Sequence, residues 1–407
     1  MAEKIRIAHI NMTEKGSTGH IMLQITALAN TRDMVAKSFS ANLYKSKNKK
    51  YAIENHRYYG WNIESTFHTI LGKITGYNGS FSCIGTRQLL NWLDEFKPDI
   101  LHLHNLHQFC INYSMLFKYI KKHNITVVWT LHDCWSFTGH CPHFIIEKCK
   151  KWKTECHHCP QYKKYPKTYV DRSKELYKKK KNLFVGVEDM TLVTPSNWLA
   201  NLVKQSFLAN YPIRVINNGI DLSVFHITDS NFRKKYFCED KKILLGVSFS
   251  WSYSKGLDVF IELSRRLDKS YQIVLVGTND AIDEMLPENI ITIHRTDDKE
   301  ELAGIYSAAD LFVNPTREDT YPTVNMEAIA CGTPVISFKS CGSPETIPEG
   351  CGLVVECDDI DDMEKNIKIL CEDKIIPKEI LIKKSTTFDM NKCFEEYIKL
   401  YSELERK

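Results

Sequence analysis

Two acidic residues in the last third of the chain have a spacing that suits a ligand-binding turn. Asp319 and Glu327 lie eight positions apart, and Pro322 between them precedes a helical pattern. A proline near a helix start leaves the amides of the first turn available, and the helix dipole favours an anion such as a diphosphate. The carboxylates can accept hydrogen bonds from hydroxyl groups. Alternatively, Asp319 is an N-cap and Glu327 is a surface charge.

A glycine-containing turn follows the first expected strand. Gly16 and Gly19 lie in the segment TEKGSTGH, which precedes an amphipathic stretch. Glycine lets the backbone approach a ligand closely, and a helix start favours an anion. The same pattern is also typical of an ordinary turn.

Histidines gather at the ends of two further expected strands. The segment DILHLHNLH holds His102, His104 and His107, and TLHDCW holds His132 and Asp133. Strand alternation places His102 and His104 on one face. A histidine at a strand end is usually a hydrogen-bonded structural residue, but His132 ends a buried strand at the expected ligand edge of the sheet.

Five of the fourteen cysteines lie within 26 residues. Four of them, with the spacing C-x7-C-x6-C-x2-C, can supply the tetrahedral thiolate shell of a structural zinc ion: Cys141, Cys149, Cys156 and Cys159. Neighbouring histidines are possible substitute ligands: His140, His143, His157 and His158. The alternative is a set of buried free thiols, because cysteine also packs as a small hydrophobe.

Short apolar segments alternate with helical patterns along the whole chain, which predicts two doubly wound parallel sheets. We expect an N-terminal domain over residues 1–211, a C-terminal domain over 212–388, and a final helix (389–407) that packs back on the first domain. The expected strands of the first half are 5–12, 99–106, 126–133 and 191–196. Those of the second half are 213–219, 242–248, 271–277, 289–295, 310–316 and 333–340.

Composition indicates an ordinary globular protein with one basic region. The chain has 407 residues and a net charge of +4, and no apolar run reaches the roughly 18 residues of a membrane-spanning helix. Without a signal-peptide pattern, we expect a cytoplasmic protein. The region 148–181 holds 13 lysines and arginines against three acidic residues. This excess suggests an anionic partner, or else a solvated lysine-rich face.

Several segments together resemble the family 4 glycosyltransferases, retaining enzymes of GT-B architecture. The region 310–338 is similar to their E-x7-E pattern and the turn after it, with Asp319 where glutamate is usual and Glu318 one residue earlier. VINNGIDLSVF (215–225), GVSFSWSYSKGLDVF (246–260) and GSPE (342–345) are similar to further family segments. The family usually has an arginine shortly before the position of Lys255, where this chain has SWS.

The resemblance implies roles for individual residues. Lys255, the Gly16 loop and the amides near Tyr321, Thr323 and Val324 would bind the donor diphosphate. Glu327 would bind the ribose and Asp319, or Glu318, the sugar. His132 would contact the transferred sugar, and His104 and Asn105 are weaker candidates for the acceptor pocket.

The resemblance also implies a UDP- or GDP-sugar donor, no catalytic metal, and a role in cell-surface polysaccharide assembly. A glycan or polyisoprenyl-diphosphate-linked acceptor at the inner membrane face would suit the basic region, and nucleic acid is a less suitable partner. The alternatives are a nucleotide-sugar epimerase or phosphorylase of the same fold, and a zinc-containing nucleic-acid binder.

Overall fold

The computed structural model describes residues 4–42, 53–107, 110–296, 298–373 and 376–405. Its contacts divide the chain into two compact units. The first unit comprises residues 1–217 together with 394–407, and the second comprises residues 218–393. Of the helices in these described ranges, not one combines the length and the hydropathy needed to cross a bilayer.

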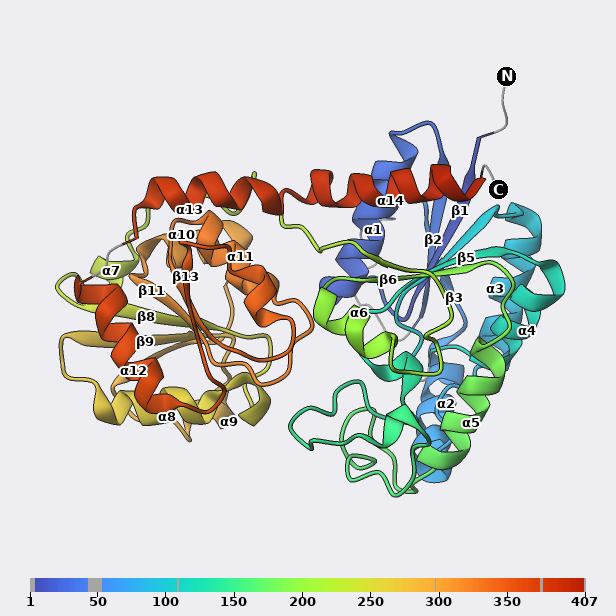
Figure 1. Ribbon diagram of the computed structural model, residues 1–407, viewed down its shortest axis with the longest axis horizontal. Helices are drawn as coiled ribbons and strands as arrows, with labels where there is room; N and C mark the ends of the chain where they lie inside the picture. The colour runs from blue at the N-terminus through green and yellow to red at the C-terminus, as the bar shows by residue number, and fades with distance from the viewer. Residues whose placement is uncertain (1–3, 43–52, 108–109, 297, 374–375, 406–407) are drawn as a thin grey trace. The chain divides into compact units, whose positions relative to one another are not determined.

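The first unit is a seven-stranded parallel sheet with helices on both faces (Figure 1). Its order is β3-β2-β1-β4-β5-β6-β7. The chain starts at β1, adds β2 and β3 on one side of it, and then adds β4 and the later strands on the other side. The strands are β1 (Arg6–Asn11), β2 (Val35–Ala41), β3 (His56–Tyr59), β4 (Ile100–Leu103), β5 (Thr126–Thr130), β6 (Met190–Thr194) and β7 (Ile213–Val215).

The helices of the first unit are α1 (Gly16–Asn30), α2 (Asn62–Thr75), α3 (Cys83–Phe96), α4 (Tyr113–His123), α5 (Ser173–Phe184) and α6 (Asn197–Val203). Short 3₁₀ turns, η1 (Trp135–Phe137) and η2 (Lys151–Lys153), lie between β5 and α5.

The last helix, α14 (Met390–Glu405), contributes its residues from Phe394 onward to the first unit. Tyr397 and Tyr401 lie one turn apart on its buried face. The hydroxyl of Tyr401 hydrogen-bonds Nδ1 of His102 at 2.6 Å, and that of Tyr397 lies 3.2 Å from the Thr130 hydroxyl. These contacts attach the helix to β4 and β5.

The second unit repeats the same strand order in a six-stranded parallel sheet, β10-β9-β8-β11-β12-β13. The strands are β8 (Lys242–Val247), β9 (Tyr271–Val276), β10 (Ile290–Ile293), β11 (Leu311–Asn314), β12 (Val335–Phe338) and β13 (Gly352–Val355). The helices are α7 (Phe232–Lys235), α8 (Leu257–Arg266), α9 (Asp280–Asp283), α10 (Lys299–Ala308), α11 (Thr323–Ala330), α12 (Ile360–Lys368) and α13 (Lys378–Ser385). Shorter turns are η3 (Tyr253–Lys255), η4 (Ser343–Thr346), η5 (Ile369–Asp373) and η6 (Thr386–Phe388).

Side-chain alternation along the strands of the second unit produces two separate cores. Ile243 and Leu245 of β8 point into one core, and Leu244 points into the other. Because both faces are covered, these strands are apolar almost throughout, as expected for a buried parallel sheet.

The expectation for segment 213–219 was wrong. β7 lies at the edge of the first sheet, because Ile213 pairs with Leu192 and Val215 with Thr194 of β6. The division between the units falls after residue 217, not at residue 212. β2, β3 and β13 were not predicted from the sequence, and two of these strands, β3 and β13, lie at sheet edges.

Candidate functional site

In the second unit, β9 and β10 are added on one side of β8 and the later strands on the other, so the strand order reverses between the neighbouring strands β8 and β11. In open parallel sheets of this kind, ligands bind at the carboxyl ends of the strands at such a switch point. Lys255 lies in the loop after β8 and Asp319 in the loop after β11. Nζ of Lys255 lies 2.6 Å from Oδ2 of Asp319, and both side chains are partly exposed. The two residues therefore form an ion pair that solvent or a ligand can reach.

The backbone around Lys255 is fixed by close packing. Gly256 has a φ of +73°, and a Cβ there would lie 2.5 Å from the carbonyl oxygen of Pro315. This contact requires glycine, since it leaves no room for a side chain and the left-handed conformation disfavours one. Lys255 is thereby held immediately before α8, where the helix dipole favours a bound anion.

The start of α11 lies beside the same ion pair. Pro322 occupies the N-cap, and no side chain caps the first turn, which begins at Thr323. Oδ1 of Asp319 accepts a hydrogen bond from the amide of Tyr321 at 3.2 Å, and its carbonyl accepts one from Gly342 at 3.1 Å. Asp319, rather than Glu318, is thus the carboxylate that pairs with Lys255.

Glu327 lies one turn further along α11 and is half-buried. The Tyr306 hydroxyl of α10 donates a hydrogen bond to its Oε2 at 3.1 Å. Burial raises the pKa of the Glu327 carboxyl, and hydrogen bonds from Tyr306 and Thr323 partly offset that rise. One carboxylate oxygen is engaged by tyrosine, so Glu327 is positioned and not a loose surface charge.

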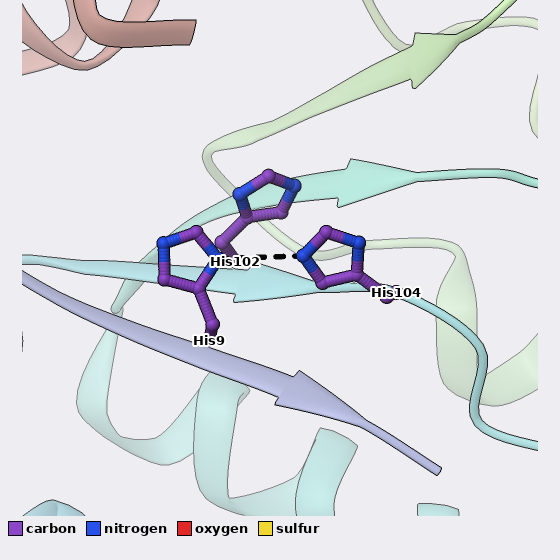
Figure 2. A group of neighbouring side chains, drawn as sticks. All are labelled: His9, His102 and His104. Atoms are coloured by element: carbon purple, nitrogen blue, oxygen red, sulfur yellow. Dashed lines mark hydrogen bonds between the residues drawn. The ribbon is translucent and has the colours of Figure 1, made fainter. Parts of the chain in front are cut away.

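The corresponding edge of the first sheet carries a row of histidines. Nδ1 of His9 lies 3.3 Å from Nε2 of His104, and Nδ1 of His104 lies 3.1 Å from Nε2 of His132. Figure 2 shows the His9, His102 and His104 rings gathered together, from β1 and from the end of β4. Burial lowers the pKa of His9 to about 3 and that of His132 to about 4, so the row is neutral near pH 7.

His9, His102 and His104 are close enough to hold a metal ion, with ligand atoms all within 4.8 Å of one another. The hydrogen bonds of these histidines explain their close approach better than a metal site does. His102 is engaged at both nitrogens, by the hydroxyls of Tyr401 and Thr130, and His104 is engaged at both by its histidine neighbours. A metal would have to displace these bonds, so we interpret the group as a hydrogen-bonded row.

Two family models match the chain. The model of Glycosyltransferase Family 4 matches residues 65–224, and the model of Glycosyl transferases group 1 matches residues 228–387. A colanic acid biosynthesis glycosyl transferase, WcaC of Escherichia coli K12, is 27% identical over 270 residues, which cover 65% of each chain. The processive diacylglycerol alpha-glucosyltransferase of Acholeplasma laidlawii is 28% identical over 39% of this chain and 51% of its own. The chain belongs to the family 4 glycosyltransferases.

Solved structures agree on the fold. A sucrose-phosphate synthase from Thermosynechococcus elongatus has a TM-score of 0.72 at 15% identity, covering 99% of this chain and 100% of its own. Anabaena HepE, solved in complex with UDP and glucose, has a TM-score of 0.67 at 14% identity, covering 98% of this chain and 100% of its own. The predicted GT-B fold with two Rossmann-like units is confirmed.

Arg317 is the main residue of this edge that the sequence analysis missed. Its guanidinium is buried and makes paired hydrogen bonds of 2.8 Å to the carboxylate of Asp258, and one of 2.6 Å to Asp358. Its amide donates to the carbonyl of Ser254 at 2.8 Å. Arg317 thus ties the Lys255 loop to the loop after β11. Its charge is used by these two aspartates, so it is a positioning residue and not a substitute for the usual family arginine.

Buried polar contacts also hold α11 in place in this family 4 glycosyltransferase. Asn325 accepts a hydrogen bond from Asn314 at 2.8 Å and donates to Thr346 at 2.8 Å and to Ser343 at 3.2 Å. Ser337 of β12 lies 2.7 Å from the Ser343 hydroxyl. This network joins α11 to the GSPE segment. Ordinary polar residues make it, so the sequence offered no signal for it.

The remaining predicted residues lie in the first unit. Gly16 begins α1 with a φ of +71°, and nothing lies within 4 Å of where its Cβ would be. Nε2 of His107 lies 2.9 Å from Oδ2 of Asp133, and its Nδ1 lies 3.0 Å from the Tyr165 hydroxyl. Cys141, Cys149, Cys156 and Cys159 all line one small cavity between β5 and α5.

Proposed function

We propose that this chain is a retaining glycosyltransferase that moves a hexosyl group from a nucleotide-sugar to a glycan or lipid-linked acceptor in cell-surface polysaccharide assembly. The observation that carries the proposal is the Lys255–Asp319 ion pair at the switch point of the second sheet, beside the start of α11. A lysine, exposed amides and a carboxylate together suit a sugar linked to a diphosphate. Similarity to WcaC supports the polysaccharide role, and the family resemblance supports retention.

In this proposal, the donor diphosphate replaces Asp319 as the partner of Lys255 when the donor binds. The ammonium group, the amides at Tyr321, Thr323 and Val324, and the Gly16 loop stabilise the negative charge that grows on the leaving diphosphate. Asp319 accepts hydrogen bonds from sugar hydroxyls, and Glu327 accepts them from the ribose. These groups supply charge neutralisation without a catalytic metal.

The proposed transfer forms the bond from the acceptor hydroxyl oxygen to the anomeric carbon as the bond from that carbon to the diphosphate breaks. The acceptor proton passes to the leaving phosphate oxygen. The neutral His132 can hydrogen-bond a hydroxyl of the transferred sugar, with His104 behind it. Its buried environment suits a hydrogen-bonding role better than that of a charged acid.

A thermal-shift panel of UDP-, GDP- and ADP-sugars tests the proposal and identifies the donor. A ligand that binds only the folded state at 100 times its Kd stabilises that state by about 2.7 kcal/mol. We expect one nucleotide class to raise the Tm of the full chain, with UDP or GDP as the base. Absence of a shift with any nucleotide-sugar would contradict the proposal.

Turnover products separate the rival activities. Conversion of the donor without an acceptor would indicate an epimerase, and dependence on inorganic phosphate would indicate a phosphorylase. Nucleic-acid binding that weakens steeply with salt, without nucleotide-sugar binding, would indicate the nucleic-acid binder. We expect instead that donor consumption requires a hydroxyl acceptor.

We further propose that the first unit contacts an anionic membrane surface through α2. This helix turns an apolar stripe to solvent, with Ile63 72% exposed and Phe67 61% exposed. The stripe continues one and two turns on, through Ile70, Leu71 and Ile74, which are also exposed. Exposed apolar patches of this kind mark interaction surfaces, and such a helix can lie in a bilayer interface.

Basic and aromatic residues flank the stripe. The amide of Tyr169 donates to the carbonyl of Lys73 at the end of α2 at 2.7 Å, which places segment 165–170 against the helix. Tyr165 and Tyr169 are exposed there. Lys167 lies in this segment, which directly follows Lys163 and Lys164, and a lysine near an anionic surface contributes about 1 kcal/mol. Charge and apolar area thus favour an anionic bilayer as the occupant.

Vesicle sedimentation tests this contact. We expect the full chain to sediment with phosphatidylglycerol vesicles and much less with phosphatidylcholine vesicles. The double substitution Ile63→Ser and Phe67→Ser should weaken binding at least about 10-fold, because each side chain contributes roughly 1.5–3 kcal/mol on burial. Ile382→Ser, at an exposed position of α13, is the matched control. Equal vesicle binding by the double variant and the wild type would contradict membrane docking. A wild-type dimer that the double substitution dissociates and Ile382→Ser does not would also contradict it.

A further inference from the structure

The segment between β5 and α5, residues 131–172, is long and irregular yet well packed. Its only helical elements are the short turns η1 and η2. Phe137, Phe144 and Trp152 are buried in it, with ring centroids 5.3 Å apart for Phe137–Trp152 and 4.9 Å for Phe144–Trp152. Loops longer than about 12–15 residues without regular structure are uncommon in compact domains and usually functional. With the buried Trp135, four aromatic rings are still a small core for a segment of this length.

All four clustered cysteines line one cavity in this segment. The cavity has a volume of about 20 Å³, enough for a particle the size of a water molecule. Cys141 and Cys156 are buried, and Cys149 and Cys159 are partly exposed. They come from three separate stretches of the loop. Four thiols that line one cavity from separate stretches can act as a cross-link where regular structure is absent.

Two polar groups around the cavity point to an anionic or ligating centre. The ammonium of Lys180 is 1% exposed and donates to the carbonyls of Trp135 at 2.7 Å and Thr138 at 3.0 Å. Within the described ranges, no carboxylate oxygen lies within 4.0 Å of it. The buried ring of His140 also lines the cavity, and its Nε2 has no hydrogen-bond partner. Buried polar groups normally have partners.

The Cys156 sulfur already accepts a hydrogen bond from a backbone amide. The amide of Gly139 donates to it at 3.2 Å, and a Cβ on Gly139 would lie 2.8 Å from the Cys156 Cβ. Amide donors of this kind stabilise a thiolate. The same amide would therefore donate to Cys156 as a thiolate.

Simple packing explains part of the cluster. Cys141 and Cys156 belong to the hydrophobic core of the first unit, next to Phe144 and Trp152. Apolar neighbours thus surround two of the four cysteines. Packing gives the buried Lys180 two carbonyl acceptors and the Trp135 ring, with its centroid 3.5 Å away, but no anionic partner, which a thiolate centre would supply.

We propose that Cys141, Cys149, Cys156 and Cys159 bind one structural zinc ion. The ion displaces four protons from the thiols and forms a tetrathiolate centre with a net charge of −2, which the Lys180 ammonium partly neutralises. Among the described residues, these sulfurs do not form a group within 4.8 Å of one another. Binding therefore draws the walls of the cavity inward. A closed shell of four thiolates leaves no position for substrate, so the zinc cross-links the loop and takes no part in transfer.

Zinc content measured by elemental analysis of the dialysed full chain tests the proposal. We expect about one zinc per chain, with most of it lost in Cys156→Ser. Cys83→Ser, at an exposed position of α3, should keep the metal. His140→Ala should also keep it, and loss of zinc in that variant with retention in Cys149→Ser would overturn the four-thiolate ligand set.

Cobalt substitution of the wild-type chain gives an answer even if Cys156→Ser does not fold. We expect thiolate-to-cobalt charge transfer and the visible absorption of a tetrahedral cobalt site. Removal of the metal with a mercurial reagent should lower Tm, because the bound ion stabilises the folded state by mass action. Zinc well below stoichiometric, with no thiolate–cobalt band, would overturn the proposal. Neither readout depends on transferase activity.

Discussion

The switch point of the second sheet carries a pair of opposite charges, whereas the histidine row of the first sheet is neutral. Both sheets place their first and fourth strands side by side, so both have the same switch point. In the second unit the loops there carry the Lys255–Asp319 ion pair and the Arg317–Asp258 pair. In the first unit β1 carries His9, which begins the histidine row and which burial keeps uncharged.

This difference separates the chemistry that each edge can perform. An anionic diphosphate requires a cation and amide donors, and the second edge offers Lys255 and the first turn of α11, which no side chain caps. A row of neutral imidazoles offers hydrogen bonds to hydroxyl groups without a charge of its own. The same backbone topology can therefore serve two kinds of ligand, and the side chains at the strand ends decide which.

The comparison is tested most severely by Lys255→Ala. Loss of the cation that neutralises the leaving diphosphate should lower kcat by ~10²–10³ while the fold survives. Steady-state kinetics with circular dichroism measures both. Lys339→Ala removes an exposed lysine that pairs with Glu356 and should leave kcat unchanged. Unchanged turnover in Lys255→Ala would remove this lysine from the mechanism.

Arg317→Lys tests whether the charged edge depends on its buried support. A lysine cannot reproduce the paired hydrogen bonds to Asp258, so the Lys255 loop should lose its attachment. We expect the free energy of unfolding to fall by about 2 kcal/mol, less than for a fully buried ion pair because the two aspartates are half exposed. The Tm should fall by roughly 4–8 °C. Turnover should fall about 10-fold as the loop shifts. A variant with normal Tm and normal turnover would show that the loop is fixed by other contacts.

His132→Gln tests the neutral edge. Loss of one transition-state hydrogen bond should lower kcat about 10-fold, while Tm falls little. His123→Gln, at the exposed end of α4, is the control. Burial lowers the pKa of His132 to about 4, so the residue is already uncharged above pH 5. The rate of the wild-type enzyme should accordingly not change between pH 5 and 8 through titration of His132. A change in rate near pH 6.5 that is lost in His132→Gln would contradict a neutral His132.

Glu327→Gln should have the smallest effect, confined to pH values above the raised pKa of Glu327, where the wild type still carries the carboxylate. Burial raises the pKa of this carboxyl, so it takes up a proton at a higher pH than an ordinary glutamate. As pH falls through that pKa, folding is favoured while the carboxylate acceptor for the ribose is lost. Donor Kd measured against pH should rise several-fold on the acid side in the wild type and stay flat in Glu327→Gln. Parallel curves for the two proteins would separate Glu327 from donor binding.

Local sequence signals predicted the fold class and the main donor-edge candidates. Strand periodicity located most of the parallel strands, because this pattern depends on neighbours within a few residues. Asp319 and Glu327 were found for a similar reason, since both flank one short helix start. The segment of β7 was assigned to the wrong sheet because its apolar pattern does not say which strand it will pair with.

The partners of these residues came only from the structure. Lys255 and Asp319 are 64 positions apart, His9 and His104 are 95 apart, and His102 and Tyr401 are 299 apart. Arg317 and His9 looked like ordinary loop and strand residues in the sequence. Their roles depend on which loops the strand order brings together.

The sequence by itself determined which segments become buried strands and where a helix start with nearby carboxylates lies, because periodicity and capping are short-range properties. Tertiary structure alone decided which charges meet, which histidines become neutral, and which cysteines share a cavity. Burial and Coulomb interactions act through space, and the distance between two side chains is set by sheet order and not by their separation along the chain.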